Sequence, residues 1–369
     1  MSISDGDHLP PPKVDAGIPF ITISDIDSSN RLNLDVKQFV PEEYYNNLKD
    51  IRKAQRNDIL YSVVGSFGIP VIIKGNDKFA FQRHIAILRP DPTKVIPDYL
   101  FYIMKTYNFY MQADSVAIGA AQRTISLTAL RNMTVELPSM DVQKKIATTL
   151  SRYDSLIDNY QKQIKLLEEA AQRLYKEWFV NLRFPGHENT KIVDGVPEEW
   201  EKKKLGSIAP ILTGKKDANY GTPDGNYPFF TCSQEPIKAP SYSFDAEAVL
   251  LAGNGDFNVK LYRGKFEAYQ RTYVLIPSNA DLLYVLYNSV AKNMVKLANG
   301  ASGSTIKFLT KRMIENIDVL VPTNTILNEY NSLRRKIQQD LENIKSQLRL
   351  LTESRDRLLP KLLSGEIEV

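Results

Sequence analysis

The sequence contains few of the residues from which catalytic and metal centres are usually built. Its 369 residues include one cysteine, Cys232, and three histidines, His8, His84 and His187. A single cysteine excludes an intrachain disulfide and a cysteine-based zinc site, and the widely separated histidines do not form an HExxH motif. Three scattered histidines also offer no basis for a Ser-His-Asp triad. We therefore expect no metal site and no catalytic residue of these kinds.

The motifs of nucleotide-driven and DNA-modifying enzymes are absent as well. There is no GxxxxGK[ST] phosphate loop, no Asn-Pro-Pro-aromatic motif for methylation of a base, and no carboxylate cluster with a lysine to hold a nuclease metal. The glycine-rich stretch 253–257 does not complete GxGxxG and is interpreted as a turn. These absences favour a chain with no cofactor and no catalytic activity of its own, and they disfavour a stand-alone nuclease.

Long apolar runs and a strong excess of one charge are also missing. No stretch approaches the roughly 18 apolar residues of a membrane span, and the N-terminus lacks the apolar core of a signal peptide. We therefore expect a cytoplasmic protein with no membrane partner. Lys and Arg number 47 against 43 Asp and Glu, and residues 1–140 carry 15 charges of each sign. With so small an excess of cations, composition alone does not indicate a nucleic-acid binder.

What the sequence does contain is an internal repeat, in which similar segments recur in the same order. The matched pairs are 17–22 with 226–231, 81–83 with 269–271, 122–125 with 303–306, and 135–138 with 319–322. From the last pair onward the offset is constant at 184 residues. Met1 aligns near Ala209, so the first copy has no counterpart of residues 196–208. We expect its leading strand to be missing or to be supplied from elsewhere.

Each copy begins with short β-branched and aromatic runs between turn residues, and ends in one long helix. In the helical part, apolar residues alternate at spacings of four and three, the a/d pattern of a coiled coil, over about 40 residues or roughly 60 Å. Asp141 and Thr323 are the expected N-caps, and Arg334 and Arg355 interrupt the second seam, where we expect snorkelling stems or looser packing. The seam positions are Ile146, Leu150, Tyr153, Ile157, Tyr160, Ile164, Leu167, Ala171, Leu174 and Trp178, then Tyr330, Arg334, Ile337, Leu341, Ile344, Leu348, Leu351, Arg355, Leu358 and Leu362.

These features predict an α+β fold with pseudo-two-fold symmetry. A narrow apolar stripe on a long helix needs a partner helix. We expect the two helices of one chain to form an antiparallel coiled coil with a globular domain at each end; the alternative is that each helix mediates homodimerisation separately. The expected parts are a first globular domain at 1–138, a central long helix at 139–182, a linker and second globular domain at 183–322, and a C-terminal long helix at 323–369.

Three stretches resemble the specificity subunits of type I restriction-modification systems. Residues 166–188, which include Gln-Arg-Leu-Tyr-Lys-Glu-Trp-Phe-Val-Asn, are similar to the central helix and linker of that family. Residues 196–206 resemble the opening of one of its target recognition domains, and residues 358–367 resemble its usual ending. Together the stretches extend the resemblance over nearly the whole chain.

The resemblance implies that each globular domain is a target recognition domain that reads one half of a split DNA sequence. The paired helices would set the spacing between the halves and dock two methyltransferase subunits, through which restriction and translocase subunits join. The chain would then serve DNA methylation and host defence without catalysing either. Because the two copies differ outside their shared loops, the double-stranded target should be asymmetric. The competing interpretation is a non-catalytic coiled-coil scaffold that dimerises two binding domains.

Candidate DNA contacts lie mostly in loops that recur in both copies. In the major groove Arg pairs with guanine and Gln or Asn with adenine, whereas Lys, Ser and Thr suit phosphates. The alternative for each loop is an ordinary structural turn, and for each basic run a solvated surface. The candidates are Ser66, Phe67, Gln82, Arg83, Gln122, Arg123, Thr124, Lys215, Lys216, Asn254, Asn258, Gln270, Arg271, Ser302, Ser304, Thr305 and Lys307.

Overall fold

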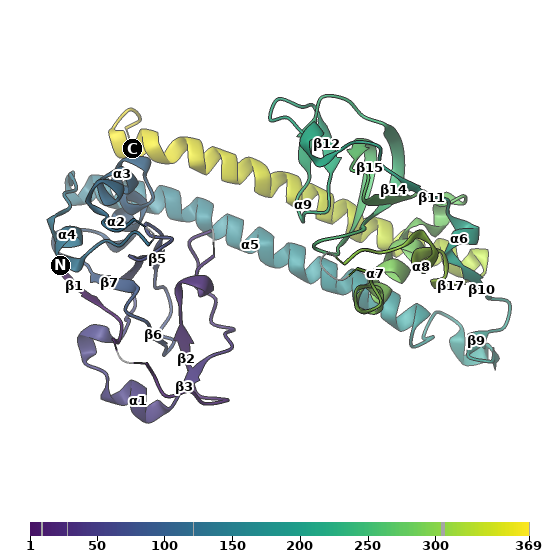
Figure 1. Ribbon diagram of the computed structural model, residues 1–369, viewed down its shortest axis with the longest axis horizontal. Helices are drawn as coiled ribbons and strands as arrows, with labels where there is room; N and C mark the ends of the chain where they lie inside the picture. Colours follow the sequence, from purple (N-terminus) through teal and green to yellow (C-terminus); the bar gives the residue numbers. More distant parts are fainter. Residues whose placement is uncertain (9, 28, 121, 304–306, 369) are drawn as a thin grey trace. The chain divides into compact units, whose positions relative to one another are not determined.

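The computed structural model describes residues 1–8, 10–27, 29–120, 122–303 and 307–368. The chain forms two compact units. Unit 1 combines Met1–Gln161 with Gln347–Val369, and unit 2 is Lys162–Ser346. Two long helices, α5 (Met140–Phe179) and α9 (Asn324–Ser364), each contribute one part to both units. Each unit therefore contains strands, short helices and a segment of both long helices (Figure 1).

The described residues of unit 1 form two small sheets. The first has the order β1 (Ser2–Asp5), β7 (Ile85–Arg89), β4 (Ile59–Ser62), β5 (Pro70–Ile72), and the second the order β3 (Phe39–Val40), β2 (Ile18–Ile21), β6 (Ala80–Phe81). Its shorter helices are α1 (Glu42–Asn47), α2 (Pro97–Met104), α3 (Tyr107–Val116) and α4 (Leu127–Asn132), with 3-10 turns at Ile23–Asp25 and Asp50–Arg52.

The described residues of unit 2 form one larger sheet and two short ladders. The sheet has the order β11 (Ile211–Thr213), β16 (Thr272–Leu275), β14 (Phe244–Ala252), β15 (Val259–Ala268), β12 (Tyr227–Phe230), β13 (Ile237–Ala239). The ladders are β8 (Ile192–Val193) with β9 (Val196–Pro197) and β10 (Glu201–Lys204) with β17 (Asp318–Val321). Its shorter helices are α6 (Leu205–Ile208), α7 (Leu283–Asn299) and α8 (Lys311–Glu315), with 3-10 turns at His187–Asn189, Ala218–Tyr220 and Ala280–Leu282.

Alternation along the central strands explains why each sheet is covered on both faces. In β4, Ile59 and Tyr61 pack into the core that contains helices α2 and α3, whereas Leu60 packs into the opposite core with Ile21. In β14 of unit 2, odd-numbered residues such as Val249 pack toward the helices and even-numbered residues toward the other side. Successive side chains of a strand point to opposite faces, so an uninterrupted apolar run is buried on both.

The strand pairing confirms the repeat. β2 and β12, which contain the matched segments 17–22 and 226–231, each pair antiparallel with the next strand and parallel with a later one. β1 pairs with β7 as β11 pairs with β16. The two units therefore share a strand arrangement as well as sequence.

Two of the matched segments were aligned in the wrong register. The Gln82 amide donates to the Ile21 carbonyl as the Tyr269 amide donates to the Phe230 carbonyl, so Gln82 corresponds to Tyr269 and not to Gln270. Thr124 exchanges two backbone hydrogen bonds with Ile118, as Phe308 does with Ser302. Residues 122–125 thus correspond to 306–309 instead of 303–306. Shared dipeptides suggest a different match between the copies. The hydrogen bonds of the ladder fix the register, and side-chain identity does not.

The seam of the long helices is confirmed as their buried side. Every predicted seam position in α5 and α9 is buried or half-buried, whereas nearby off-seam leucines such as Leu166 and Leu350 are exposed. Within unit 1, Leu150 of α5 shares a core with Leu359 of α9. Within unit 2, the rings of Trp178 and Tyr330 lie 5.8 Å apart. Within unit 1 an early part of α5 therefore lies against a late part of α9, and within unit 2 a late part of α5 lies against an early part of α9.

One N-cap and both seam arginines differ from the prediction. Thr323 caps α9, since its hydroxyl accepts from the Ile326 amide at 3.5 Å, but Ser139 rather than Asp141 begins α5 by accepting from Val142 at 3.5 Å. Arg334 does not snorkel: it is 3% exposed, and its guanidinium lies 4.9 Å from the centre of the Tyr284 ring. Arg355 pairs with Asp154 of α5 at 2.8 Å and with Asp356 of its own helix at 2.7 Å.

Candidate nucleic-acid interface

In unit 1 two of the predicted loops lie against each other. The Gly65 amide donates to the Arg123 carbonyl at 2.9 Å, and Ile118 and Thr124 exchange hydrogen bonds of 2.9 and 2.8 Å. Gly65 and Gly119 have φ values of +69° and +106°, which glycine adopts readily. The described residues of 64–68 and 118–124 therefore form one surface feature, called loop pair 1.

Unit 2 repeats this construction. Ser302 and Phe308 exchange hydrogen bonds of 3.0 and 2.8 Å, and the Leu309 amide donates to the Gly253 carbonyl at 2.7 Å. Gly255 and Gly303 have φ values of +68° and +104°, close to those of their counterparts in unit 1. The described residues of 253–258 and 302–308 form loop pair 2. The predicted contacts Ser304 and Thr305 lie outside the described residues.

The register of the two loop pairs makes Arg123 and Lys307 equivalent, 184 residues apart. The Lys307 side chain is exposed. Arg123 is 41% exposed and forms an ion pair with Asp114 on α3, while its guanidinium lies 5.4 Å from the centre of the Phe67 ring. A guanidinium has five N–H donors, so pairing with one carboxylate orients the group and leaves donors for a second partner.

Phe67 is buried beneath the surface of loop pair 1, where its ring supports Arg123. It is 9% exposed and stacks on Tyr110 of α3 with ring centres 5.8 Å apart. Ser66 and Gln122 are exposed beside it, and Thr124 is half-buried. Loop pair 1 therefore presents one hydroxyl, one amide and one oriented cation, and the buried Phe67 ring supports them from below.

One asparagine of loop pair 2 is held within the protein by its side chain, and the other pairs through its backbone. The Asn258 amide donates to the Cys232 carbonyl at 3.0 Å, and its side-chain oxygen accepts from Lys260. Burial lowers the pKa of this lysine. Asn254 is half-buried and bridges to Phe308. These bonds stabilise the loop, and they leave Lys307 and Ser302 as its exposed polar side chains among the predicted contacts.

The remaining candidates lie at the strand ends. Arg83, Lys215, Gln270 and Arg271 are exposed, whereas Gln82 and Lys216 are half-buried. The Lys216 ammonium lies 4.3 Å from the centre of the Tyr220 ring, and the Gln270 amide donates to Asp217 at 2.5 Å.

Backbone bonds connect one strand end to the loops in each unit. The Gly253 amide donates to the Arg271 carbonyl at 2.8 Å, as the Val63 amide does to His84 at 2.9 Å. Sequence reasoning missed His84 and Asp114, which have no counterpart of the same type in the second copy and so carried no repeat signal.

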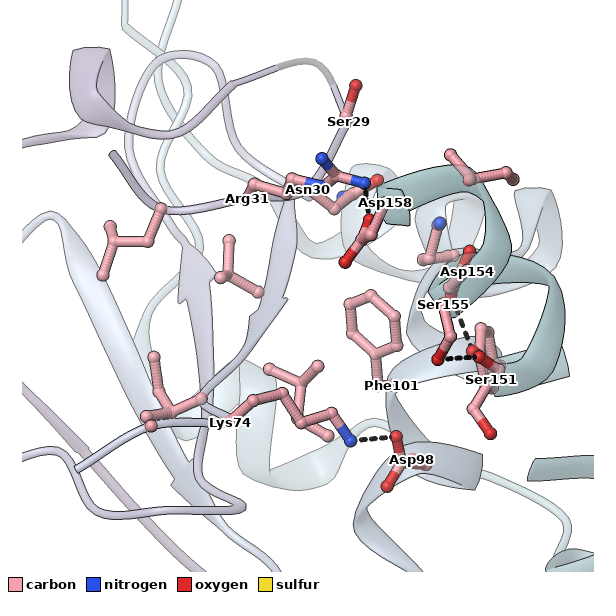
Figure 2. Close-up of a pocket in the computed structure, with 18 of the residues that line it drawn as sticks. Ser29, Asn30, Arg31, Lys74, Asp98, Phe101, Ser151, Asp154, Ser155 and Asp158 are labelled. Carbon is pink, nitrogen blue, oxygen red and sulfur yellow. Dashed lines mark hydrogen bonds and ion pairs between the residues drawn. The ribbon is translucent and has the colours of Figure 1, made fainter. Parts of the chain in front are cut away.

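Unit 1 also contains a cavity of about 1040 Å³ between loops of the sheets and the long helices (Figure 2). Charged groups meet there: Arg31 pairs with Asp158, and Asp154 accepts from the Tyr102 hydroxyl at 2.6 Å and from Arg355 at 2.8 Å. Burial lowers the pKa of Lys105 on the same wall. Most of these charges satisfy one another, so a hydrogen bond from α2 and an ion pair from α9 meet on Asp154 of α5 at the cavity wall.

Two further absences concern only the part of the chain that the structure describes. No group of three or more His, Cys, Asp or Glu side chains there is arranged to hold a metal ion. No helix there is both long and apolar enough to cross a membrane.

Alanine at Gly119 is expected to disrupt loop pair 1. At φ +106° an L-residue is strained by about 1–2 kcal/mol, and the new Cβ would lie 2.6 Å from the Gln122 carbonyl oxygen. Hydrogen exchange at residues 118–124 should accelerate. Gly186→Ala is the matched control, because Gly186 has φ +84° but no atom within 4 Å of the added Cβ. Equal effects of both substitutions on local exchange would contradict the clash.

Comparison with known proteins follows the same division of the chain. The family described as type I restriction modification DNA specificity domain matches residues 10–169 and 197–351. The type I restriction enzyme EcoDI specificity subunit of Escherichia coli is 36% identical over 178 residues, which span 47% of this chain and 39% of that subunit. The MjaIX specificity subunit of Methanocaldococcus jannaschii is 26% identical over 306 residues, 74% of this chain and 70% of the relative.

A solved structure has the same fold. The crystal structure of the type I restriction-modification S subunit from M. genitalium superposes with a TM-score of 0.65 at 18% identity, covering 98% of this chain and 93% of that one.

Proposed function

The chain belongs to the type I restriction-modification specificity subunits, and from this premise we propose that it recognises a bipartite, asymmetric sequence in double-stranded DNA. One target recognition domain at 1–138 would read one half, and a second within 183–322 would read the other. The observation that carries the proposal is the loop pair built twice, with a cation at the same position each time. Arg123 and Lys307 differ in type, which supports two different half-sites.

The loop pairs are suited to a groove or a phosphate backbone in different ways. An oriented arginine such as Arg123 can donate two bonds to a guanine, whereas a lysine such as Lys307 acts as a point charge on a phosphate. Ser66, Gln122, Thr124 and Ser302 would add polar contacts beside these cations. Phe67 would support its loop, because it is buried beneath Arg123.

The strand-end residues would contribute phosphate contacts that set register. Exposed cations and amides suit this role, because phosphate contacts position a protein without reading bases. The residues assigned to it are Gln82, Arg83, Lys215, Lys216, Gln270 and Arg271.

We further propose that α5 and α9 form one antiparallel coiled coil with pseudo-two-fold symmetry. Two cross-helix ion pairs support it: Arg355 with Asp154 at 2.8 Å in unit 1, and Lys345 with Glu168 at 2.7 Å in unit 2. The paired helices would set the spacing between the half-sites. They would also dock two methyltransferase subunits, and through them the restriction and translocase subunits. The chain itself would carry no catalysis and need no cofactor.

The second candidate function is a coiled-coil scaffold that dimerises two binding domains. The apolar seam of α5 and α9 favours this scaffold as much as it favours the DNA-recognition function. A crosslinked homodimer that forms without any methyltransferase subunit would support the scaffold.

Modification-sensitive long-read sequencing tests the main proposal. DNA from cells that express this chain with its cognate methyltransferase subunit is compared with DNA from cells without the chain. The expected result is a new methylated motif made of two unlike short halves around an unspecified spacer. A complex that assembles but yields no motif would count against DNA recognition by these domains. A complex that does not assemble would favour the scaffold.

The isolated chain is expected to bind DNA only weakly. Residues 1–140 are electrically neutral, so few phosphates can be neutralised without partner subunits. We expect a Kd in the range of non-specific binding, about 10⁻⁴–10⁻⁶ M at physiological salt, with a shallow salt dependence. Fluorescence anisotropy over a salt series measures both. A nanomolar Kd for the chain alone would overturn this prediction.

A further inference from the structure

A third segment of unit 2, residues 231–235, is attached to loop pair 2. It lies between strands β12 and β13. The Asn258 side chain donates to the Cys232 carbonyl at 3.0 Å, and the Lys260 ammonium donates to the Ser233 carbonyl at 2.8 Å. Because one donor belongs to the loop pair and the other to the strand that follows it, these bonds hold the segment beside the loop pair.

The attachment brings an exposed amide against an exposed carboxylate. The Gln234 side-chain nitrogen donates a hydrogen bond to Asp256 of loop pair 2. An ionised carboxylate can only accept hydrogen bonds, so Asp256 fixes which end of the Gln234 amide faces it. One N–H is used in this bond. No described residue bonds to the second N–H or to the side-chain oxygen of Gln234, so both are left for another partner.

The corresponding segment of unit 1 is closed on itself. Residues 22–26 match 231–235, and in both segments the threonine hydroxyl lies 2.7 Å from the hydroxyl of the serine two positions later. Asp25 stands at the position of Gln234, but its carboxylate accepts from the amide and from the hydroxyl of Thr22, each at 2.7 Å. Asp25 is thus engaged in its own turn, whereas Gln234 reaches the loop pair.

In unit 1 the oriented group comes from the other segment of the loop pair, where Asp114 pairs with Arg123. Ala298 of unit 2 stands at the position of Asp114, because in each case the amide three residues later donates to its carbonyl at 3.3 Å. Lys307 therefore has no carboxylate at the position that orients Arg123. The side chain of loop pair 2 that a carboxylate orients is instead Gln234.

Building on the DNA recognition proposed above, we propose that Gln234 reads an adenine in the half-site of unit 2 and that Asp256 is the residue that positions it. In the major groove adenine presents the N7 acceptor and the N6 donor, which match the free N–H and oxygen of the amide. Guanine presents two acceptors there, so the oxygen of Gln234 would face a second acceptor. The amide cannot rotate to suit guanine, because its oxygen would then face Asp256.

Modification-sensitive sequencing of DNA from cells that express the Gln234→Ala chain with its methyltransferase subunit tests this role. One half of the motif should lose its preference for an adenine by about 5- to 150-fold, and the other half should stay unchanged. If the unaltered chain itself yields no motif, DNA recognition fails and this inference fails with it. If the unaltered chain yields a motif that Gln234→Ala leaves intact, only the role of Gln234 is overturned.

Gln234→Arg is the sharper variant, because it predicts a new base instead of a lost preference. Asp256 would orient the guanidinium as Asp114 orients Arg123, so guanine should replace the adenine at the same position. Asp256→Asn should relax the adenine more weakly than Gln234→Ala does. An asparagine amide both donates and accepts, so it no longer fixes which end of the Gln234 amide faces the DNA. A new base preference at a different position would overturn the assignment.

Gln270→Ala is the matched control. The Gln270 amide also donates to a carboxylate, that of Asp217, but it lies at a strand end. Its removal should lower methylation at all sites without changing the motif, as expected for a phosphate contact. Because Gln234 and Gln270 are both exposed, neither substitution should shift the midpoint of thermal unfolding. A lower midpoint for Gln234→Ala with an unchanged motif would show that its bond to Asp256 only stabilises the loop.

Discussion

Alanine at Tyr330 is expected to produce the largest loss of stability of any single change described for this chain. Tyr330 of α9 is 0% exposed, and its ring lies 4.9 Å from Phe179 edge-to-face and 5.8 Å from Trp178, both on α5. Removal of a buried aromatic ring typically costs 3–5 kcal/mol, because the lost contacts leave a cavity. The substitution removes the ring that joins the two long helices in unit 2.

Tyr330→Phe is the matched control, because it keeps the ring and removes only the hydroxyl. That hydroxyl accepts from the Asn288 side chain at 3.1 Å, and Asn288 also donates to the Tyr284 carbonyl at 2.8 Å. The phenylalanine variant should therefore lose only about 0.5–1.5 kcal/mol. Urea unfolding followed by tryptophan fluorescence measures both, since Trp178 and Trp200 lie in the same core. Similar losses in the two variants would show that packing is not what Tyr330 contributes.

Alanine at Arg123 is expected to relax one half of the methylated motif. If this guanidinium reads a base, its removal costs about 1–3 kcal/mol of discrimination at that position, roughly 5- to 150-fold. The half-site assigned to unit 2 should stay unchanged, because Arg123 belongs to unit 1. The sequencing assay reports each half separately. A motif that keeps all its bases while methylation falls uniformly would assign Arg123 to a phosphate instead.

Three variants sharpen this result. Arg123→Lys keeps the charge but not the two-pronged geometry, so it should relax the same base. Asp114→Asn should act in the same direction but more weakly, since it frees the guanidinium from its ion pair. Lys307→Ala should lower methylation at all sites without changing the motif, as expected for a phosphate contact. Loss of the complex in any variant would indicate misfolding, which thermal unfolding detects.

The loop pairs mark where sequence reasoning about the site succeeded and where it stopped. The loops were identified because they recur in both copies. In each unit, backbone hydrogen bonds join the two segments of the loop pair. The equivalence of Arg123 with Lys307 was hidden, because the match of 122–125 with 303–306 was three residues out of register. Asp114 was missed because a single carboxylate on a helix gives no signal until folding places it beside a cation.

The sequence by itself determined the features that depend on local periodicity and on repetition. The seam of both helices follows from spacings of four and three, since side chains at those spacings share a helix face. The Thr323 cap and the equivalence of β2 with β12 are likewise local. Family membership rests on stretches that are contiguous in sequence, so it too needed no tertiary structure.

Only the tertiary structure decided what depends on partners distant in the chain. Arg334 stacks on Tyr284 and Arg355 pairs with Asp154, and neither partner could be chosen from the seam pattern. The register of the loops depends on which backbone groups bond across a ladder. Those bonds are formed between strands far apart in sequence, and a shift of one residue preserves composition while changing every pair.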